Sequence, residues 1–230
     1  QCVEEQMGLY KRFRDEDGVL FEAAKNAYFE RFPARAKDYE KYKWFVTSTG
    51  NLVVGGKNAE QNEALLNKLK ALNKDYVIMH THEPGSPFSA ILAPINKTSK
   101  SDIEQTAIFT ASFSKAWKQG KNKANVDMFN LSQLYKSQNM KLGTWGVKDK
   151  IKHMEVPLSL VLTIQKSHLR AIPEKAVKSK KAILLKIAPG KTDKTLLISK
   201  LKELLKNKFT SEEILSALPA GGLEIIKTKK

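Results

Sequence analysis

Apolar residues that recur at steps of three, four and seven indicate an amphipathic helix over residues 9–43. Packing against the rest of the protein is the favoured role for its apolar face, and a protein-interaction module that makes oligomers is the alternative. Pro33 interrupts the stripe, which consists of Leu9, Phe13, Leu20, Ala24, Tyr28 and Phe32.

The pattern then changes to short apolar runs separated by turn residues, which is typical of a β-hairpin. A hairpin is predicted over residues 44–54, with its turn at residues 49–51. Asn58 is a typical helix N-cap, and Gln61 is placed to reach back as in a capping box. The helix that begins there is predicted to continue to about Leu72.

Strands and helices are interleaved in the remaining pattern. Residues 75–82 indicate a buried strand and residues 84–94 a loop, and a helix capped by Ser101 is predicted over residues 101–117. A Pro189-Gly190 turn leads into another helix. Further strands are predicted at residues 126–131, 144–151, 158–163, 182–187 and 223–226, with a short helix capped by Thr210 or Ser211.

This order of elements predicts the α+β class, because helices and strands do not alternate as regular β–α–β units. The expected architecture is a mixed β-sheet packed with helices and preceded by the N-terminal amphipathic helical segment. We divide the chain into that helical segment (residues 1–43), a core (residues 44–152) and a C-terminal α/β extension of the same domain (residues 153–230). The apolar runs are shorter than the ~20 residues that cross a bilayer, so no membrane association is expected.

Charge adds a functional expectation, because 40 Lys and Arg residues against 24 Asp and Glu give a net charge of +16. Such a surplus attracts polyanions, chiefly nucleic acid, and a solvated lysine-rich surface is the alternative explanation. Lysine far outnumbers arginine, which favours contacts with phosphates over the reading of bases. A single cysteine, Cys2, excludes an internal disulfide and is typical of the reducing cytoplasm.

Two basic segments that each contain a tryptophan are candidate RNA contacts, "SFSKAWKQGKNK" and "GTWGVKDKIKH". Lysines at alternate strand positions share one face and form a row for phosphates. An exposed tryptophan beside them stacks on a base, whereas a buried one supports the core, and both roles stay open here. The predicted RNA-binding residues are Lys57, Lys115, Trp117, Lys118, Lys121, Trp145, Lys148, Lys150 and Lys152.

The pair His80-x-His82 raises the question of a metal site, because alternate residues of a strand lie on one face. A third ligand would have to come from Glu63, Glu83 or Asp102 in space, and the other two histidines stand in unrelated contexts. No metal, cofactor or catalytic residue is therefore predicted. An RNA-modifying or metal-dependent hydrolytic enzyme that uses His80 and His82 is kept as the alternative function.

Four segments together resemble the NFACT-R family of RNA-binding domains: "WFVTSTGNLVVGGKNAEQNE", "DYVIMHTHEPGS", "FSKAWKQGK" and "LGTWGVKDK". The likeness covers about residues 40–152, and the block Asn-Ala-x-Gln-Asn-Glu is its most specific part. The matching positions are Trp44, Phe45, Ser48, Gly56, Lys57, Asn58, Ala59, Gln61, Asn62, Glu63, Asp75, His80, Ser114, Ala116, Trp117, Gly143 and Trp145.

The resemblance implies binding of tRNA or rRNA, with the large ribosomal subunit as a partner, in ribosome-associated quality control or RNA metabolism. The chain looks like a stand-alone, archaeal-type version, so a protein partner that supplies the missing NFACT domains is expected. The family motif implies a set of residues that organise the domain or an RNA-facing pocket: Asn58, Gln61, Asn62, Glu63, Asp75 and His80.

Overall fold

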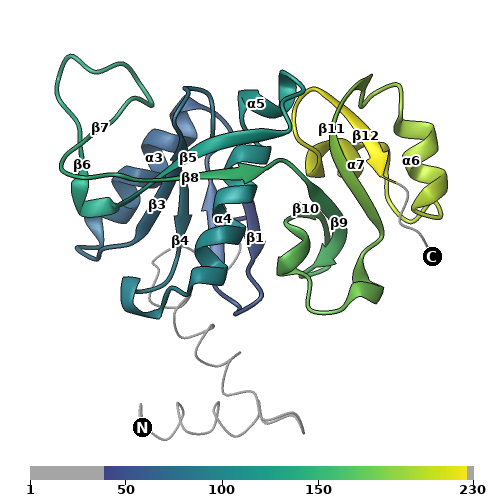
Figure 1. The fold of residues 1–230 in the computed structure, drawn as a ribbon, viewed down its shortest axis with the longest axis horizontal. Coiled ribbons are helices and arrows are strands. Elements are labelled where there is room, and N and C mark those ends of the chain that lie inside the picture. Colours follow the sequence, from purple (N-terminus) through teal and green to yellow (C-terminus); the bar gives the residue numbers. More distant parts are fainter. Residues whose placement is uncertain (1–38, 227–230) are drawn as a thin grey trace, which may run out of the picture. The chain divides into compact units, whose positions relative to one another are not determined.

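The computed structural model describes residues 39–226 (Figure 1). The amphipathic helix predicted at the start of the chain lies outside these residues, apart from the last few positions of its segment. From residue 42 onward the described chain belongs to one compact unit of helices and antiparallel sheets. The α+β class is thus confirmed. Among the described helices, none combines the length and the apolar character needed to cross a membrane.

Six strands form an antiparallel sheet in the order β1-β2-β4-β3-β5-β8. The predicted hairpin is confirmed, since β1 and β2 pair across a turn in which Gly50 adopts a φ of 93° that favours glycine. Residues 89–91, predicted as loop, instead form a buried inner strand. The strands are β1 (Lys43–Val46), β2 (Leu52–Gly55), β3 (Val77–Thr81), β4 (Ser89–Ile91), β5 (Lys123–Asn130) and β8 (Lys152–Pro157).

Helix α4 (Lys100–Ser112) packs across one face of this sheet, and α3 (Ala59–Ala71) lies on the other side (Figure 1). Val77 and Met79 of β3 belong to the same hydrophobic core as the buried side of α4. Successive side chains of a strand point to opposite faces, so His80 points away from α4. The histidine-bearing face of β3 is therefore the face that α4 does not cover.

Four further strands form a second antiparallel sheet in the order β10-β9-β11-β12. The terminal strand and the helix capped by Thr210 are confirmed. The predicted Pro189-Gly190 turn is wrong, because both residues lie inside β11 at a bulge opposite Leu223. This part contains β9 (Leu160–Gln165), β10 (His168–Ile172), β11 (Leu185–Asp193), β12 (Gly222–Ile226), α6 (Ile198–Leu204) and α7 (Ser211–Ala217).

Two other elements differ from the sequence prediction. The single helix predicted over residues 101–117 is two helices, α4 with Ser99 as its N-cap, and α5 (Lys115–Lys118) with Ser114 as its N-cap. The strand predicted over residues 144–151 shrinks to β7 (Gly146–Val147), which pairs with β6 (Leu134–Tyr135). Short 3-10 turns lie at η1 (Ile95–Lys97), η2 (Leu131–Gln133), η3 (Glu174–Ala176) and η4 (Lys180–Ala182).

The two larger sheets share one hydrophobic core, which includes Phe45 from the first and Leu160 from the second. Hydrogen bonds also join them: Val46 donates from its backbone N–H to the side chain of Gln165 at 2.8 Å, and the Gln165 amide returns a bond to the Val46 carbonyl at 2.9 Å. The indole N–H of Trp117 donates to the carbonyl of Gly222 at 3.0 Å. The second sheet is therefore packed and hydrogen-bonded to the first.

Candidate nucleic-acid interface

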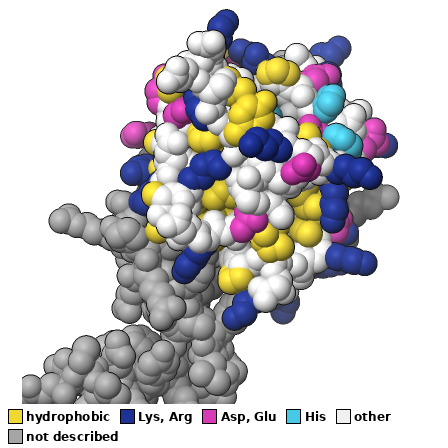
Figure 2. All heavy atoms as spheres, turned by 90° about the vertical axis from the view of Figure 1, so that its left-hand side faces the viewer, with side chains coloured by type: hydrophobic (Ala, Val, Ile, Leu, Met, Phe, Trp, Pro, Cys, Tyr) yellow, Lys and Arg dark blue, Asp and Glu magenta, His cyan; other side chains and the backbone are white. Residues whose placement is uncertain are grey.

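The seven lysines predicted to contact RNA all have exposed side chains. Figure 2 shows one face of the molecule, on which lysine and arginine side chains are spread widely, with acidic side chains among them. Whether these lysines touch RNA stays a prediction, but each of them is placed where a phosphate can reach it. They are Lys57, Lys115, Lys118, Lys121, Lys148, Lys150 and Lys152.

A surface hollow of about 150 Å³ brings Lys115 and Lys121 together. The backbone N–H of Lys115 donates to the carbonyl of Gly85 at 2.9 Å, which fixes the start of α5 against the loop after β3. Gly85 has a φ of 109°, and a Cβ there would lie 2.5 Å from Cδ of Lys115. The backbone conformation favours glycine at this position, and a Cβ there would also force the stem of Lys115 to move.

Acidic residues neutralise part of the charge in this hollow. Lys121 pairs with Glu83 at 2.9 Å, and Lys123 pairs with Glu155 at 2.8 Å. Within residues 39–226, no carboxylate forms an ion pair with Lys115. Lys115 is therefore the lysine of the hollow whose charge is available to an incoming phosphate.

The prediction that Lys148, Lys150 and Lys152 occupy alternate positions of one strand is wrong. Only Lys152 lies in a strand, the first residue of β8, and Asp149 between the other two has a φ of 66°. The side-chain amide of Gln133 donates to the carbonyls of Lys148 and Lys150 at 3.0 and 3.2 Å. The segment is thus a turn fastened to its neighbour, and its lysines do not form a strand-spaced row.

Of the two roles left open for the tryptophans, the structure supports the core role. Trp117 has no exposed surface, and Trp145 is 9% exposed. The ammonium groups of Lys70 and Lys136 lie 5.8 and 5.6 Å from the centre of the Trp145 ring, so cations already occupy its surroundings. Neither indole presents a face on which a base stacks without rearrangement of the core.

The motif residues on α3 fasten the helix to its surroundings. The Asn58 side chain accepts from the backbone N–H of Gln61 at 2.9 Å, as predicted for an N-cap. The Gln61 side chain accepts from the backbone N–H of Lys57, one residue earlier than a capping box requires. Asn62, which is buried, accepts from the backbone N–H of Phe88 at 2.9 Å, so it ties α3 to the strand that follows the Pro84–Gly85 loop.

Two acidic motif residues hold loops rather than line a common pocket. One carboxylate oxygen of Glu63 accepts from Lys136 Nζ at 2.8 Å and from the backbone N–H of Gly143 at 2.9 Å. Asp75 accepts from the backbone N–H and the hydroxyl of Ser132 at 2.9 and 2.7 Å. The family motif implies either that these residues organise the domain or that they form an RNA-facing pocket. The contacts of Glu63 and Asp75 fit the first of these roles.

His80 and His82 do not form a pair. The His80 ring stacks on Phe88 with centroids 4.4 Å apart, and its Nδ1 lies 2.7 Å from the carbonyl oxygen of Thr81. Burial lowers the pKa of His80, in spite of the hydrogen bond to Thr81. His82 instead faces the carboxylate of Asp127, so the metal pair considered from the sequence is not assembled by the fold.

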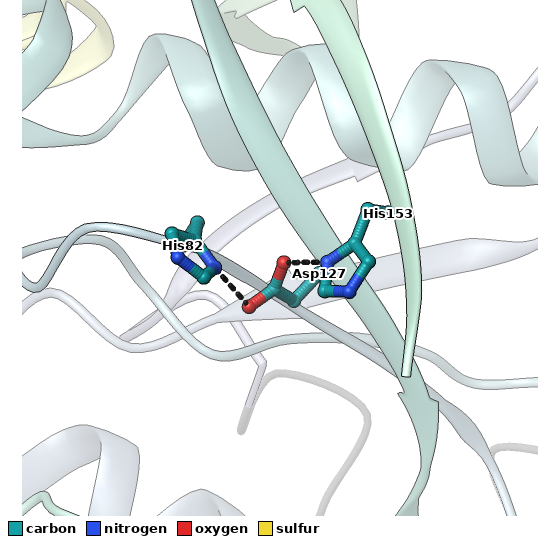
Figure 3. Close-up of side chains that lie close together, drawn as sticks. All are labelled: His82, Asp127 and His153. Carbon is teal, nitrogen blue, oxygen red and sulfur yellow. Dashed lines mark hydrogen bonds and ion pairs between the residues drawn. The ribbon is translucent and has the colours of Figure 1, made fainter. Parts of the chain in front are cut away.

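A cluster of three side chains escaped the sequence analysis: His82, Asp127 and His153 (Figure 3). Nδ1 of His82 lies 3.1 Å from Oδ2 of Asp127, and Nδ1 of His153 lies 2.6 Å from Oδ1 of the same carboxylate. His153 lies on β8, an element that was not predicted, and this is why its context looked unrelated. The sequence held one signal for the cluster: Asp127 lies between the apolar residues Val126 and Met128 in a predicted strand, so its side chain was expected on the opposite face from theirs.

The fold and the exposed lysines define a basic α+β domain. The motif residues of its helix α3 hydrogen-bond to neighbouring loops, and several of its loops are rich in lysine. Residues 41–149 match the family described as the NFACT protein RNA binding domain. The resemblance to the NFACT-R family that was drawn from the sequence is confirmed over these residues.

A curated relative, the archaeal Rqc2 homolog aRqcH of Methanocaldococcus jannaschii, is 30% identical over 203 residues. The aligned region is 83% of this chain and 30% of the relative, so the chain spans less than a third of that protein. Among solved structures, the C-terminal part of the fibronectin/fibrinogen-binding protein from Streptococcus suis aligns at a TM-score of 0.44 with 25% identity. This alignment covers 51% of the present chain and 45% of the other, too partial a likeness for a structural argument.

Proposed function

We propose that this protein binds tRNA or rRNA in translation-linked quality control or RNA metabolism in the cytoplasm, with the large ribosomal subunit as a partner. The observation that carries the proposal is the match of residues 41–149 to an RNA-binding domain family. The net charge of +16 supports an RNA partner, because a lysine surplus binds phosphates through counterion release. The relative named as an archaeal Rqc2 homolog supports the assignment to a ribosome-linked process.

In the proposed mode of binding, lysines contact the phosphate backbone and the shape of the RNA supplies selectivity. Contacts to phosphates fix position and carry no sequence information directly. The burial of Trp117 and Trp145 supports this mode, because base stacking on either ring would require the core to open. Lys115 is the first candidate contact, since it lines the hollow and has no ion-pair partner among the described residues.

The proposal covers binding alone. The chain spans 30% of its curated relative, so activities of the whole relative do not transfer to it. A protein partner that carries other NFACT domains, and recruitment to a large ribosomal subunit, are further parts of the proposal. No enzymatic step is proposed, because His80 is packed against Phe88 and does not pair with His82.

The test is a binding titration of the purified chain with tRNA and with an equally charged duplex DNA, repeated over a range of salt concentrations. We expect tighter binding to tRNA that persists at physiological salt, because a shape-specific site adds to the general phosphate attraction. Equal affinity for both polymers, with the same steep loss in salt, would contradict an RNA-specific function.

A pair of lysine variants tests the assignment of the surface. Lys115→Gln is expected to weaken binding to every RNA alike and to reduce the slope of log affinity against log salt by about one unit. The matched control is Lys208→Gln, an exposed lysine after α6. Equal slopes for Lys115→Gln and the control would mean that the hollow does not contact RNA, even if the chain still binds tRNA.

A further inference from the structure

We propose that His82, Asp127 and His153 form a binding site for a divalent transition-metal ion of the Zn²⁺ class. Each residue offers one ligand atom, and these atoms all lie within 4.8 Å of one another. The three side chains come from three neighbouring segments, and both rings turn toward the carboxylate between them (Figure 3). This site differs from the His80–His82 pair, and it does not depend on the proposed RNA binding.

The backbone places the three side chains on one face of the sheet. Asp127 on β5 stands directly opposite His80 on β3 and directly opposite His153 on β8. His82 lies two residues beyond His80, on the same face, and its backbone N–H donates to the carbonyl of Asn125 at 2.9 Å. Strand pairing therefore sets the positions of Asp127 and His153, and the backbone hydrogen bond to Asn125 holds His82 just past the end of β3.

The distances suit a shared ion after small side-chain rotations. The carboxylate oxygens of Asp127 lie 3.1 and 2.6 Å from the Nδ1 atoms of His82 and His153. Ligand atoms that bind one Zn²⁺ ion at roughly 2.0–2.2 Å lie about 3–3.5 Å apart in tetrahedral geometry. The two rings stand at 81° to each other with centroids 5.9 Å apart, so an ion between the Nδ1 atoms displaces no ring stack.

The chemistry of the donors selects the kind of metal. Two imidazoles and one carboxylate are typical ligands of Zn²⁺ and of its transition-metal neighbours, whereas Mg²⁺ and Ca²⁺ prefer oxygen ligands. The side chain of Asp127 is 15% exposed, while those of His82 and His153 are 66% and 59% exposed. Three protein ligands at an open surface leave a coordination position for water or for a group of a bound partner.

The experiment is a calorimetric titration of the full chain, purified without a histidine tag, with ZnCl₂ and separately with MgCl₂. The background is Cys2→Ser, which removes the one thiol of the chain as a competing zinc ligand. We expect about one equivalent of Zn²⁺ to bind, as for a mononuclear site, and Mg²⁺ not to compete. Asp127→Asn and His153→Gln are expected to lower the zinc affinity by about tenfold or more.

His168→Gln is the matched control, because His168 is an exposed histidine on β10 and stands outside the cluster. His82→Gln gives a second test with little risk to folding, since His82 is exposed and lies just past the end of β3. Far-ultraviolet circular dichroism checks that each variant is folded.

Substitution with Co²⁺ supplies an independent readout, because its visible absorption reports the ligands around the ion. We expect the Co²⁺ spectrum to be lost in His82→Gln and His153→Gln and retained in His168→Gln. Absence of zinc binding by the starting protein, or equal binding by all variants, would overturn the proposal. The cluster would then be a hydrogen-bonded triad in which one carboxylate holds two imidazoles.

Discussion

The ammonium group of Lys43 lies in an unusual place for a cation. It donates to the carbonyl of Ser216 at 2.8 Å, and it lies 4.9 Å from the centre of the Phe113 ring. Burial, and after it the charges of Lys194 and Lys57, lower the pKa of Lys43 from 10.5 to about 7. The folded protein therefore releases a proton from this lysine in a range where the unfolded chain keeps it.

This difference in pKa between the folded and unfolded states predicts that Lys43 contributes to the pH dependence of stability, and that Lys43→Met removes this contribution. Between about pH 7 and 10.5 the unfolded chain binds more protons at this position, so the wild-type protein gains stability as the pH rises. After allowance for solvent screening at a half-buried site, we expect an effect on the order of 1 kcal/mol, or ~2–4 °C in Tm. The measurement is Tm against pH for both proteins, with Lys208→Met as the control. Parallel curves for wild type and Lys43→Met would exclude the shifted pKa.

At the scale of elements, Asp102 joins the β1–β2 turn to the start of α4. Its carboxylate accepts from the hydroxyl of Thr49 at 2.5 Å, the amide of Asn51 at 3.1 Å and the backbone N–H of Ser99 at 2.8 Å. Burial alone would raise the pKa of Asp102, but hydrogen bonds, chiefly from Thr47 and Thr49 and then from Ser99, hold it below the ordinary value of 3.8. One buried carboxylate thus fixes the position of the helix relative to the hairpin.

Replacement of this carboxylate by an amide, Asp102→Asn, should destabilise the protein by about 1–3 kcal/mol near neutral pH, because buried donors lose a charged acceptor. A carboxylate with a lowered pKa stabilises the fold above its unfolded value of 3.8, and this contribution disappears as the pH falls through the lower, folded value. We therefore expect the wild type and Asp102→Asn to converge in urea stability under acid. Glu224→Gln, at an exposed carboxylate on β12, is the control. If the difference in stability between wild type and Asp102→Asn stayed constant down to acid pH, the lowered pKa of Asp102 would be refuted.

At the scale of the whole molecule, two sheets behave as one body from residue 42 onward. The core cluster includes Met79 of the first sheet and Ile187 of the second, and Trp117 links α5 to β12. The division of the chain into a domain core over residues 44–152 and an extension over residues 153–230 stays a prediction. The hydrophobic core that the two parts share determines whether they unfold together. A shared core indicates a single cooperative unit.

Gln165→Ala tests this cooperativity, because its side chain holds both the N–H and the carbonyl of Val46 across the two sheets. Loss of these two hydrogen bonds should cost about 1–3 kcal/mol and shift the midpoint of urea unfolding without a change in its slope. Glu224→Gln serves again as the control. A second transition in the variant, seen by tryptophan fluorescence but not by circular dichroism, would show that the sheets unfold separately.

The sequence alone was enough to predict those features of the protein that depend on residues close together in the chain. The hairpin around Gly50, the caps at Asn58 and Thr210 and the class of the fold follow from turn residues, capping side chains and periodicity. The family resemblance followed from the motif around Gln61 and Asn62, because the order of those side chains along the helix is itself the signal. The exposure of the lysines followed from charge.

Only the tertiary structure decided which strands pair and in what register. Strands β4 and β8 were missed because their stability comes from pairing with distant segments, which a local pattern does not contain. Strand β10 was also missed, although it pairs with β9 across a turn at Lys166 and Ser167. The burial of Trp117 depends on its packing against β12. The register of β3, β5 and β8 brings His82 and His153 to the carboxylate of Asp127. Hydrogen bonds between strands that are far apart in the sequence assembled this cluster.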